Sequence, residues 1–225
     1  IGIKTLKPFT IKKKIGQALD QLSKINQKII SQNKLPIVLG GEHSITPGSI
    51  RPFVKKYKEI VILHFDAHAD LRESYNGQKF SHASAIKRCL DFKNVKVISF
   101  GIRNLSKAEM VFYKNNKNRI KIFWGKDKKN WNFNKITSLF KKKNVYITFD
   151  VDAFDASIMP ATGTPEPGGM LWEEVLMILK KVCKISNIIG VDINELAPIK
   201  NFNSYNFLVA KLTYKIMAYI FKFKR

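Results

Sequence analysis

Cysteine is scarce in this sequence, and long apolar runs are missing from it. Cys89 and Cys183 are the only two cysteines among the 225 residues, and they form neither a CxxC pair nor a disulfide-framework spacing. No window approaches the roughly 18 consecutive apolar residues that a membrane span requires. The opening residues Ile1–Lys4 are not followed by the apolar stretch of a secretory signal. We therefore expect two reduced thiols in a cytoplasmic protein that has no membrane partner.

Acidic residues and arginines are also few. Lysine and arginine total 40 against 17 aspartates and glutamates, a formal net charge of +23, yet only six of these cations are arginine. A basic face that binds nucleic acid is one interpretation. Specific recognition usually relies on arginine, however, and the densest clusters, at residues 12–14 and 141–143, are short and lack interleaved aromatic residues. We interpret the charge as a compositional bias on solvated faces and expect no specific nucleic-acid partner.

Hydrophobic residues make up 45% of the chain and follow two kinds of pattern. The length suffices for one domain with a sizeable core, and no repeat or linker divides residues 1–225. Helical spacing predicts helices over residues 10–33, 49–58, 82–92, 105–115, 133–142, 171–184 and 203–222. Short apolar runs predict strands over residues 37–39, 60–65, 95–100, 120–124, 145–149 and 188–193. Strands that are apolar on both faces and alternate with helices indicate an α/β fold, in which helices cover both sides of a parallel sheet.

Histidine is scarce as well, and its distribution is informative. All four histidines lie between positions 43 and 82, namely His43, His64, His68 and His82. His68 lies between Asp66 and Asp70, directly after the predicted strand 60–65, and the spacing i, i+2, i+4 would place these side chains on one side of an extended segment. Because ligands bind beyond the carboxyl ends of parallel strands, this segment is a candidate site. We interpret His64 as a core histidine or as one that supports a ligand.

A second pair of acidic residues follows another predicted strand. Asp150 and Asp152 come at the end of the apolar run 145–149 and would again face one side. Each motif alone also fits a helix N-cap, but burying several carboxylates together is costly without a cation. Four carboxylates and two imidazoles are too many for one tetrahedral zinc ion and suit two octahedral divalent ions, Mn²⁺ best. The candidate metal ligands are therefore His43, Asp66, His68, Asp70, Asp150 and Asp152.

Three motifs that contain these residues resemble those of the ureohydrolases, the family of arginase and agmatinase. Residues 40–44 (Gly-Gly-Glu-His-Ser) look like the family's GG(D/E)HS motif, residues 66–70 like DAHxD, and residues 148–155 like (S/T)FDxDxxD. The resemblance extends from about Leu35 to Pro198. It implies an arginase-like fold, a three-layer α/β/α domain with a mainly parallel sheet, and a dinuclear manganese site.

The resemblance also implies a role for each candidate ligand. One ion would be held by His43, Asp66, Asp70 and Asp150. The other would be held by His68, Asp66, Asp150 and Asp152. Asp66 and Asp150 would thus bridge the two ions, and Asp155 would support the site from behind. Water bridging two Mn²⁺ ions is expected to lose its proton near neutral pH and to attack the guanidinium carbon of the substrate, with Asp70 orienting the hydroxide.

Further residues match family positions that handle the substrate. His82, within residues 79–84, resembles the family's proton-shuttling histidine, although it also fits a helix cap. Glu195 resembles the glutamate that binds the guanidinium through charge-assisted hydrogen bonds. Thr164 lies in a Pro- and Gly-rich loop over residues 162–169, which is expected beside the site. These stretches look more like agmatinases than arginases, because the Asn- and Gly-rich motif expected for the α-amino and carboxylate groups of arginine is not found.

The resemblance thus implies a manganese-dependent hydrolase that converts agmatine to putrescine and urea, a step of polyamine biosynthesis. Another guanidino substrate, such as guanidinobutyrate or arginine, is an alternative on the same catalytic apparatus. A degenerate metal-binding member with an interaction role, for example with RNA, is an alternative of a different class. Family members commonly form trimers or hexamers, which implies a homo-oligomer here.

The N-terminal segment and the net charge differ from what the resemblance leads us to expect. Only about 35 residues precede the first motif, so the N-terminal segment is expected to be shortened, and its start at Ile1 is a candidate fragment boundary. The net charge of +23 disfavours the long-range approach of dicationic agmatine, although nearby carboxylates could overcome this.

Residues 216–225 fit either a basic membrane-contacting helix or a closing core helix with a frayed cationic tail, and we favour the core helix.

Overall fold

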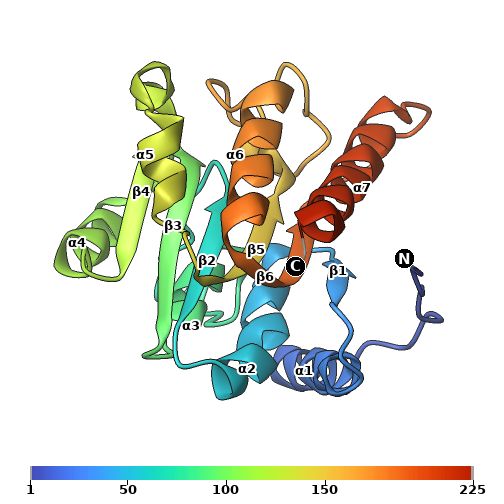
Figure 1. Ribbon diagram of the computed structural model, residues 1–225. Coiled ribbons are helices and arrows are strands. Elements are labelled where there is room, and N and C mark those ends of the chain that lie inside the picture. Colours follow the sequence, from blue (N-terminus) through green and yellow to red (C-terminus); the bar gives the residue numbers. More distant parts are fainter. Residues whose placement is uncertain (1, 224–225) are drawn as a thin grey trace.

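Six strands form one parallel sheet in the computed structural model, which describes residues 2–223 (Figure 1). The strands are β1 (Ile37–Leu39), β2 (Ile60–Phe65), β3 (Val95–Ile102), β4 (Ile120–Trp124), β5 (Asn144–Asp150) and β6 (Asn187–Asn194). Their order across the sheet is β1-β6-β5-β2-β3-β4, and each neighbouring pair is parallel. Every residue of β2 is buried, as expected of a central strand that is covered on both faces.

Helices cover both faces of this sheet (Figure 1). One layer consists of α1 (Ile15–Ser31), α2 (Thr46–Lys56), α3 (Ala85–Leu90) and α4 (Lys107–Asn115). The other consists of α5 (Phe133–Ser138), α6 (Trp172–Ile185) and α7 (Ser204–Phe223). Each layer encloses its own hydrophobic core, so that Phe53 and Cys89 belong to the first core and Val175 and Leu212 to the second. The predicted three-layer α/β/α architecture with a parallel sheet is confirmed.

Each predicted strand is present, with ends within two residues of the predicted ones, whereas four helices, α1, α3, α4 and α5, are shorter than predicted. Helix α1 begins at Ile15 rather than at residue 10, because the three cations of residues 12–14 would oppose the positive end of the helix dipole. The side chain of Gln21 instead binds the extended backbone of Thr10. Helix α5 ends at Ser138, and Lys142 takes a left-handed φ of 58° while its N–H donates to the backbone at the end of α6.

Helix α7 is the closing core helix that the sequence favoured. Its inward face buries Val209, Leu212, Ile216 and Ile220 in the core shared with α6. The predicted frayed tail, residues 224–225, lies outside the described residues. None of the helices in the described part of the chain combines the length and the apolar character needed to cross a bilayer.

Candidate metal centre

The two acidic segments follow the two central strands of the sheet. Strand β2 lies beside β5, and their register pairs Phe65 with Phe149, so Asp66 and Asp150 come next at the same level. Chain connections lead away from this pair in opposite directions, because β3 follows β2 on one side and β6 follows β5 on the other. Loops diverge at such a point and leave a crevice beyond the carboxyl ends of the strands. The candidate ligands therefore meet where an α/β sheet usually binds its ligand.

Neither segment stays extended, contrary to the geometry that we assumed from sequence spacing. Strand β2 ends at Phe65, and Asp70 has a left-handed φ of 52°. Asp150 is the last residue of β5, whereas Asp152 lies in the 3₁₀ turn η4 (Val151–Ala153). Asp150 caps this turn by accepting the backbone N–H of Asp152 at 2.9 Å. The carboxylates converge because the chain turns after each strand, and not because their residues alternate along a strand.

Three carboxylates surround one nitrogen of His43. The Nδ1 atom lies 3.1 Å from Asp66 Oδ2, 3.1 Å from Asp70 Oδ2 and 3.4 Å from Asp150 Oδ2. All four side chains are almost entirely buried. Despite these short distances, Nδ1 is a buried atom that has no partner in hydrogen-bonding geometry among the described residues. These four residues are the ones predicted to hold the first ion.

The hydrogen bonds behind His43 determine which of its nitrogens bears a proton. Tyr146 donates to the buried carboxylate of Asp192 at 2.7 Å, and so does Asn194. The hydroxyl of Thr148 donates to Asp192 as well and must therefore accept from His43 Nε2, which lies 2.8 Å away. In neutral His43 this leaves a lone pair on Nδ1 that faces three carboxylates. Such an arrangement is unfavourable without a cation between these atoms, so the donor set fits a metal ion.

A second group shares Asp66 with the first. His68 Nδ1 lies 3.0 Å from Asp152 Oδ2 and 3.6 Å from Asp66 Oδ1. The other oxygen of Asp152 accepts the backbone N–H of Ala67 at 2.9 Å, which fixes the carboxylate. All six predicted ligands thus come together in two overlapping groups of His and Asp donors. A pair of hard divalent ions suits such oxygen-rich donors.

The pKa values of these residues show how closely the charges are packed. Burial, followed by repulsion from neighbouring aspartates, raises the pKa of Asp150 well above its ordinary value and raises that of Asp152. Burial and then Asp66 raise the pKa of Asp70 to about 7. Burial opposes ionisation of His68, but the neighbouring Asp152 and Asp66 raise its pKa to about 11. Without metal, the cluster must hold extra protons, and divalent cations can take their place.

His64 lies directly behind Asp66. Its Nε2 is 2.8 Å from Asp66 Oδ2, and its Nδ1 is 3.0 Å from the hydroxyl of Ser99 on the next strand. Burial lowers the pKa of His64, so a neutral ring can donate one hydrogen bond to Asp66. His64 is close enough to join the first group, but both of its ring nitrogens already have protein partners. This position agrees with the role of a residue that supports a ligand.

A cavity of about 320 Å³ lies beside the cluster and contains the other predicted site residues. Thr164 donates to Asp152 at 3.4 Å. Glu195, in a left-handed conformation with a φ of 67°, accepts the backbone N–H of His43 at 2.6 Å. His82 lies at the wall of the cavity, where its Nδ1 is 2.8 Å from a carboxylate oxygen of Glu42. The acidic residues that line the cavity are Asp70, Glu109, Asp150, Asp152 and Glu195.

One alternative interpretation, that of His82 as a helix cap, and one role implied by the resemblance, that of Asp155, need correction. His82 does not cap the following helix, because the side chain of Ser81 accepts the capping N–H from Ala83. Asp155 has hydrogen bonds to Ser157 and to the backbone of Gly169, and to none of the six candidate ligands in the described structure. It supports the site only by joining two parts of the adjacent loop.

Sequence reasoning missed several residues around the cavity. Glu42, which pairs with His82, had a signal because it lies in the same motif as His43. Tyr75 packs its ring edge against His82, with centroids 5.4 Å apart, and Arg72 lies over the ring of Tyr75. Neither Arg72 nor Tyr75 had a signal, because their contacts depend on a turn, residues 75–78, that folds back beside the site.

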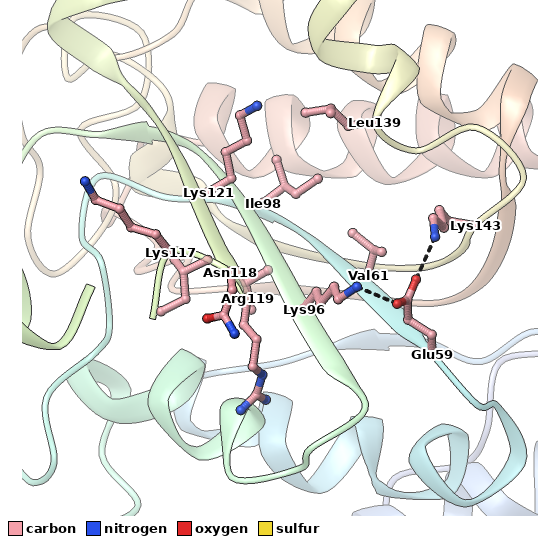
Figure 2. A pocket seen from close by; sticks show the side chains of 12 residues that line it. Glu59, Val61, Lys96, Ile98, Lys117, Asn118, Arg119, Lys121, Leu139 and Lys143 are labelled. Carbon is pink, nitrogen blue, oxygen red and sulfur yellow. Dashed lines mark hydrogen bonds and ion pairs between the residues drawn. The ribbon is translucent and has the colours of Figure 1, made fainter. Parts of the chain in front are cut away.

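Most of the lysines lie away from the cavity, and no lysine of the described chain lines it. A second hollow, of about 240 Å³, lies at the opposite, amino end of the sheet (Figure 2). Lys96 and Lys143 point into the same region there and both bind Glu59, at 2.6 and 2.7 Å. Three further cations line this hollow, namely Lys117, Arg119 and Lys121. This group of five cations therefore lies at the end of the sheet opposite the candidate metal centre.

Known proteins share both the sequence and the fold. The model of the arginase family matches residues 1–219. The N(1)-aminopropylagmatine ureohydrolase of Synechocystis sp. is 34% identical over 196 residues, which cover 84% of this chain and 62% of that protein. The agmatinase of Pyrococcus horikoshii is 35% identical over 94% of this chain and 71% of its own length. This chain thus spans roughly two thirds of the length of these relatives.

Solved structures agree with these sequence relatives. The crystal structure of the agmatine ureohydrolase of Thermoplasma volcanium matches with a TM-score of 0.84 and 30% identity, and the match covers 95% of this chain and 72% of that one. An arginase from Medicago truncatula matches with a TM-score of 0.78 and 26% identity over 91% of this chain and 65% of its own. The fold, the His/Asp cluster and the sequence relatives agree, and the chain belongs to the arginase family.

Proposed function

We propose that this protein hydrolyses a guanidino compound to urea and an amine, with two Mn²⁺ ions at the candidate centre and agmatine as the first candidate substrate. The main support is the convergence of two overlapping His and Asp groups at the floor of an acidic cavity. A guanidinium is a planar cation, and carboxylates beside the cluster would attract it. The relatives described above include an agmatinase and an aminopropylagmatine ureohydrolase.

The proposed ligands divide into two sets that share bridging carboxylates. One set is His43, Asp66, Asp70 and Asp150. The other is His68, Asp66, Asp150 and Asp152. Divalent ions held by these sets would supply Lewis acidity and a nucleophile derived from water at neutral pH. Thr148 donates to Asp192 and accepts from Nε2 of His43. These buried hydrogen bonds keep His43 in the tautomer that offers Nδ1 to an ion.

The remaining residues would bind the substrate and move protons. Glu195 can accept from the guanidinium while it also holds the backbone of His43, because a carboxylate has two acceptor oxygens. Thr164 lines the same cavity, and while its hydroxyl donates to Asp152 its oxygen can accept a hydrogen bond from the guanidinium. His82 is partly exposed at the cavity wall, where its Nδ1 pairs with the carboxylate of Glu42. His82 would therefore deliver a proton to the departing amine.

Urea release from a panel of guanidino compounds tests this proposal. The Mn²⁺-loaded chain should give its highest kcat/KM with agmatine, and lower values with N(1)-aminopropylagmatine, 4-guanidinobutyrate and arginine. If the protein prefers a compound that bears a carboxylate, the assigned substrate is wrong but the assigned reaction stands. If the protein binds two ions per chain but releases urea from none of these compounds, the degenerate metal-binding alternative replaces the hydrolase.

Replacing Glu195 with Gln should lower kcat/KM for the substrate without loss of bound metal. The amide of Gln still accepts the N–H of His43 but lacks the negative charge that attracts a guanidinium. We expect kcat/KM for agmatine to fall by about 10- to 100-fold, the effect of losing a hydrogen bond to a charged group. Glu173→Gln on the exposed first turn of α6 makes the same charge change and should have no effect. Unchanged kcat/KM in Glu195→Gln would remove Glu195 from the binding site.

A further inference from the structure

The carboxylate of Glu166 lies beside a predicted metal ligand, on a loop that the motifs do not connect with the metal. Its Oε1 atom is 3.9 Å from Nε2 of His68. The amide of Asn104, which follows β3, donates to the same oxygen and so orients it. Glu166 is about one third exposed, so water can reach this contact.

Several backbone contacts hold Glu166 in this place. The guanidinium of Arg103 donates to the backbone oxygens of Glu166 at 2.7 Å and of Asp152 at 2.8 Å. The backbone N–H groups of Arg103 and Asn104 both donate to the oxygen of Ala67. These hydrogen bonds join the loop of Glu166, the end of β3 and the segment of His68. They therefore fix the backbone of Glu166 relative to His68.

The two nitrogens of His68 face different surroundings. Nδ1 faces Asp152 and Asp66, the carboxylates of the second metal group, whereas Nε2 faces Glu166. When Nδ1 of a histidine binds a metal, the proton must lie on Nε2. A carboxylate that accepts this proton orients the ring and makes the metal-binding nitrogen more basic.

We propose that Glu166 is a positioning residue that accepts a hydrogen bond from Nε2 of His68, directly or through one water, and thereby strengthens the second metal site. This inference rests on the proposed function, because it requires an ion on Nδ1 of His68. The distance of 3.9 Å is longer than a direct hydrogen bond and fits either a bridging water or a small movement of the exposed side chain. Asn104 would keep the carboxylate turned toward His68.

Titration of the metal-free full chain with Mn²⁺ tests this role in the variant Glu166→Gln. Gln can still accept from Asn104, so the loop should keep its place while the negative charge beside His68 is lost. We expect the wild type to bind two ions and the variant to bind one of them about 10- to 100-fold more weakly, the range found when partners of metal ligands are removed. Calorimetry gives the two affinities, and the Mn²⁺ EPR spectrum shows whether the ions remain a coupled pair.

Two further variants separate positioning from a merely structural role. Glu173→Gln removes the same charge from an exposed site on α6 and should leave both affinities unchanged. Asn104→Ala removes the hydrogen bond that orients the carboxylate of Glu166. It should weaken binding of the same ion, but to a smaller extent than Glu166→Gln. If Glu166→Gln binds both ions with the affinities of the wild type, the inference is wrong. It is also wrong if the metal-free variant loses enough thermal stability to account for its weaker metal binding. A wild type that binds no Mn²⁺ overturns the proposed function, and this inference with it.

Discussion

Asp150→Asn is expected to abolish urea release almost completely, with kcat reduced by roughly a thousandfold. Asp150 is the carboxylate predicted to bridge both ions, and its Oδ2 lies 3.4 Å from His43 Nδ1. Asn has nearly the same shape but offers one neutral oxygen in place of a bridging anion. Stabilisation by a metal is worth several kcal/mol in the transition state, and about 4 kcal/mol corresponds to this factor. Urea release and metal content per chain should be measured together.

The same substitution should not destabilise the metal-free protein. Burial and neighbouring aspartates raise the pKa of Asp150 well above its ordinary value, so the ionised carboxylate is unfavourable in the folded chain without metal. A neutral amide avoids this cost, and the thermal midpoint of the metal-free variant should equal or exceed that of the wild type.

Asp127→Asn is the matched control for this experiment. Asp127 is exposed in the turn η3 (Gly125–Asn130) and does not line the cavity beside the cluster, and its replacement makes the same change of charge and shape. This control should keep full activity and two ions per chain. If Asp150→Asn still turned over agmatine at a similar rate, the assignment of a bridging carboxylate would be wrong.

The overall architecture was predictable because its signals are local. Continuous apolar runs such as residues 60–65 can be buried only in a strand that is covered on both sides, and β2 is buried throughout. The positions of Asp66 and Asp150 at the ends of such runs led to the correct edge of the sheet. The order of the strands could not be predicted in this way, because it depends on packing between segments far apart in the chain.

The detailed geometry of the centre was less predictable. Spacing alone suggested extended segments, whereas Asp70 has a left-handed φ and Asp152 lies in a 3₁₀ turn. Turns after a strand follow from capping and packing, which a residue pattern does not specify. The contact between Glu166 and His68 was missed for a similar reason, since it depends on where the loop over residues 160–169 folds back.

The distribution of charge around the cavity resolves part of the conflict between a basic protein and the cationic substrate that we propose. The cavity beside the cluster has five acidic residues and one arginine, whereas the hollow at the amino end of the sheet has five cations and one glutamate. Screening in physiological salt limits the influence of exposed lysines to about 8 Å. A guanidinium that reaches the cavity therefore meets mainly carboxylates, despite the net charge of +23.

Mn²⁺ should stabilise the protein strongly, and more so at pH 8.5 than at pH 6.5. Two ions at about 100 times their Kd would each add about 2.7 kcal/mol, which corresponds to a rise in Tm of about 10 °C or more for a chain of this size. Contacts with aspartates raise the pKa of His43 well above its ordinary value near 6.5, and they raise the pKa of His68 to about 11. The folded metal-free chain therefore keeps protons that the unfolded chain releases above about pH 6.5.

The sign of the pH effect follows from these two histidines. Because their pKa values are raised, the stability that their protonation provides is complete below about pH 6.5 and is lost as the pH rises toward about 11. Bound Mn²⁺ replaces these protons, so the loss affects only the metal-free protein and the gain in Tm grows with pH. Burial raises the pKa of Cys89 and Cys183, so their ionisation in the unfolded chain also lowers stability at high pH, but this loss is the same with and without Mn²⁺ and cancels in the gain in Tm.

Thermal melts with and without Mn²⁺ at pH 6.5, 7.5 and 8.5 measure this gain directly, with a chelator present in the metal-free samples. Asp127→Asn should behave as the wild type, whereas Asp150→Asn should show a much smaller gain at every pH because it lacks the bridging carboxylate. A gain in Tm that is independent of pH would mean that Mn²⁺ does not displace protons from His43 and His68. It would then have to bind elsewhere on the protein, since both histidines lie within the two groups that define the centre.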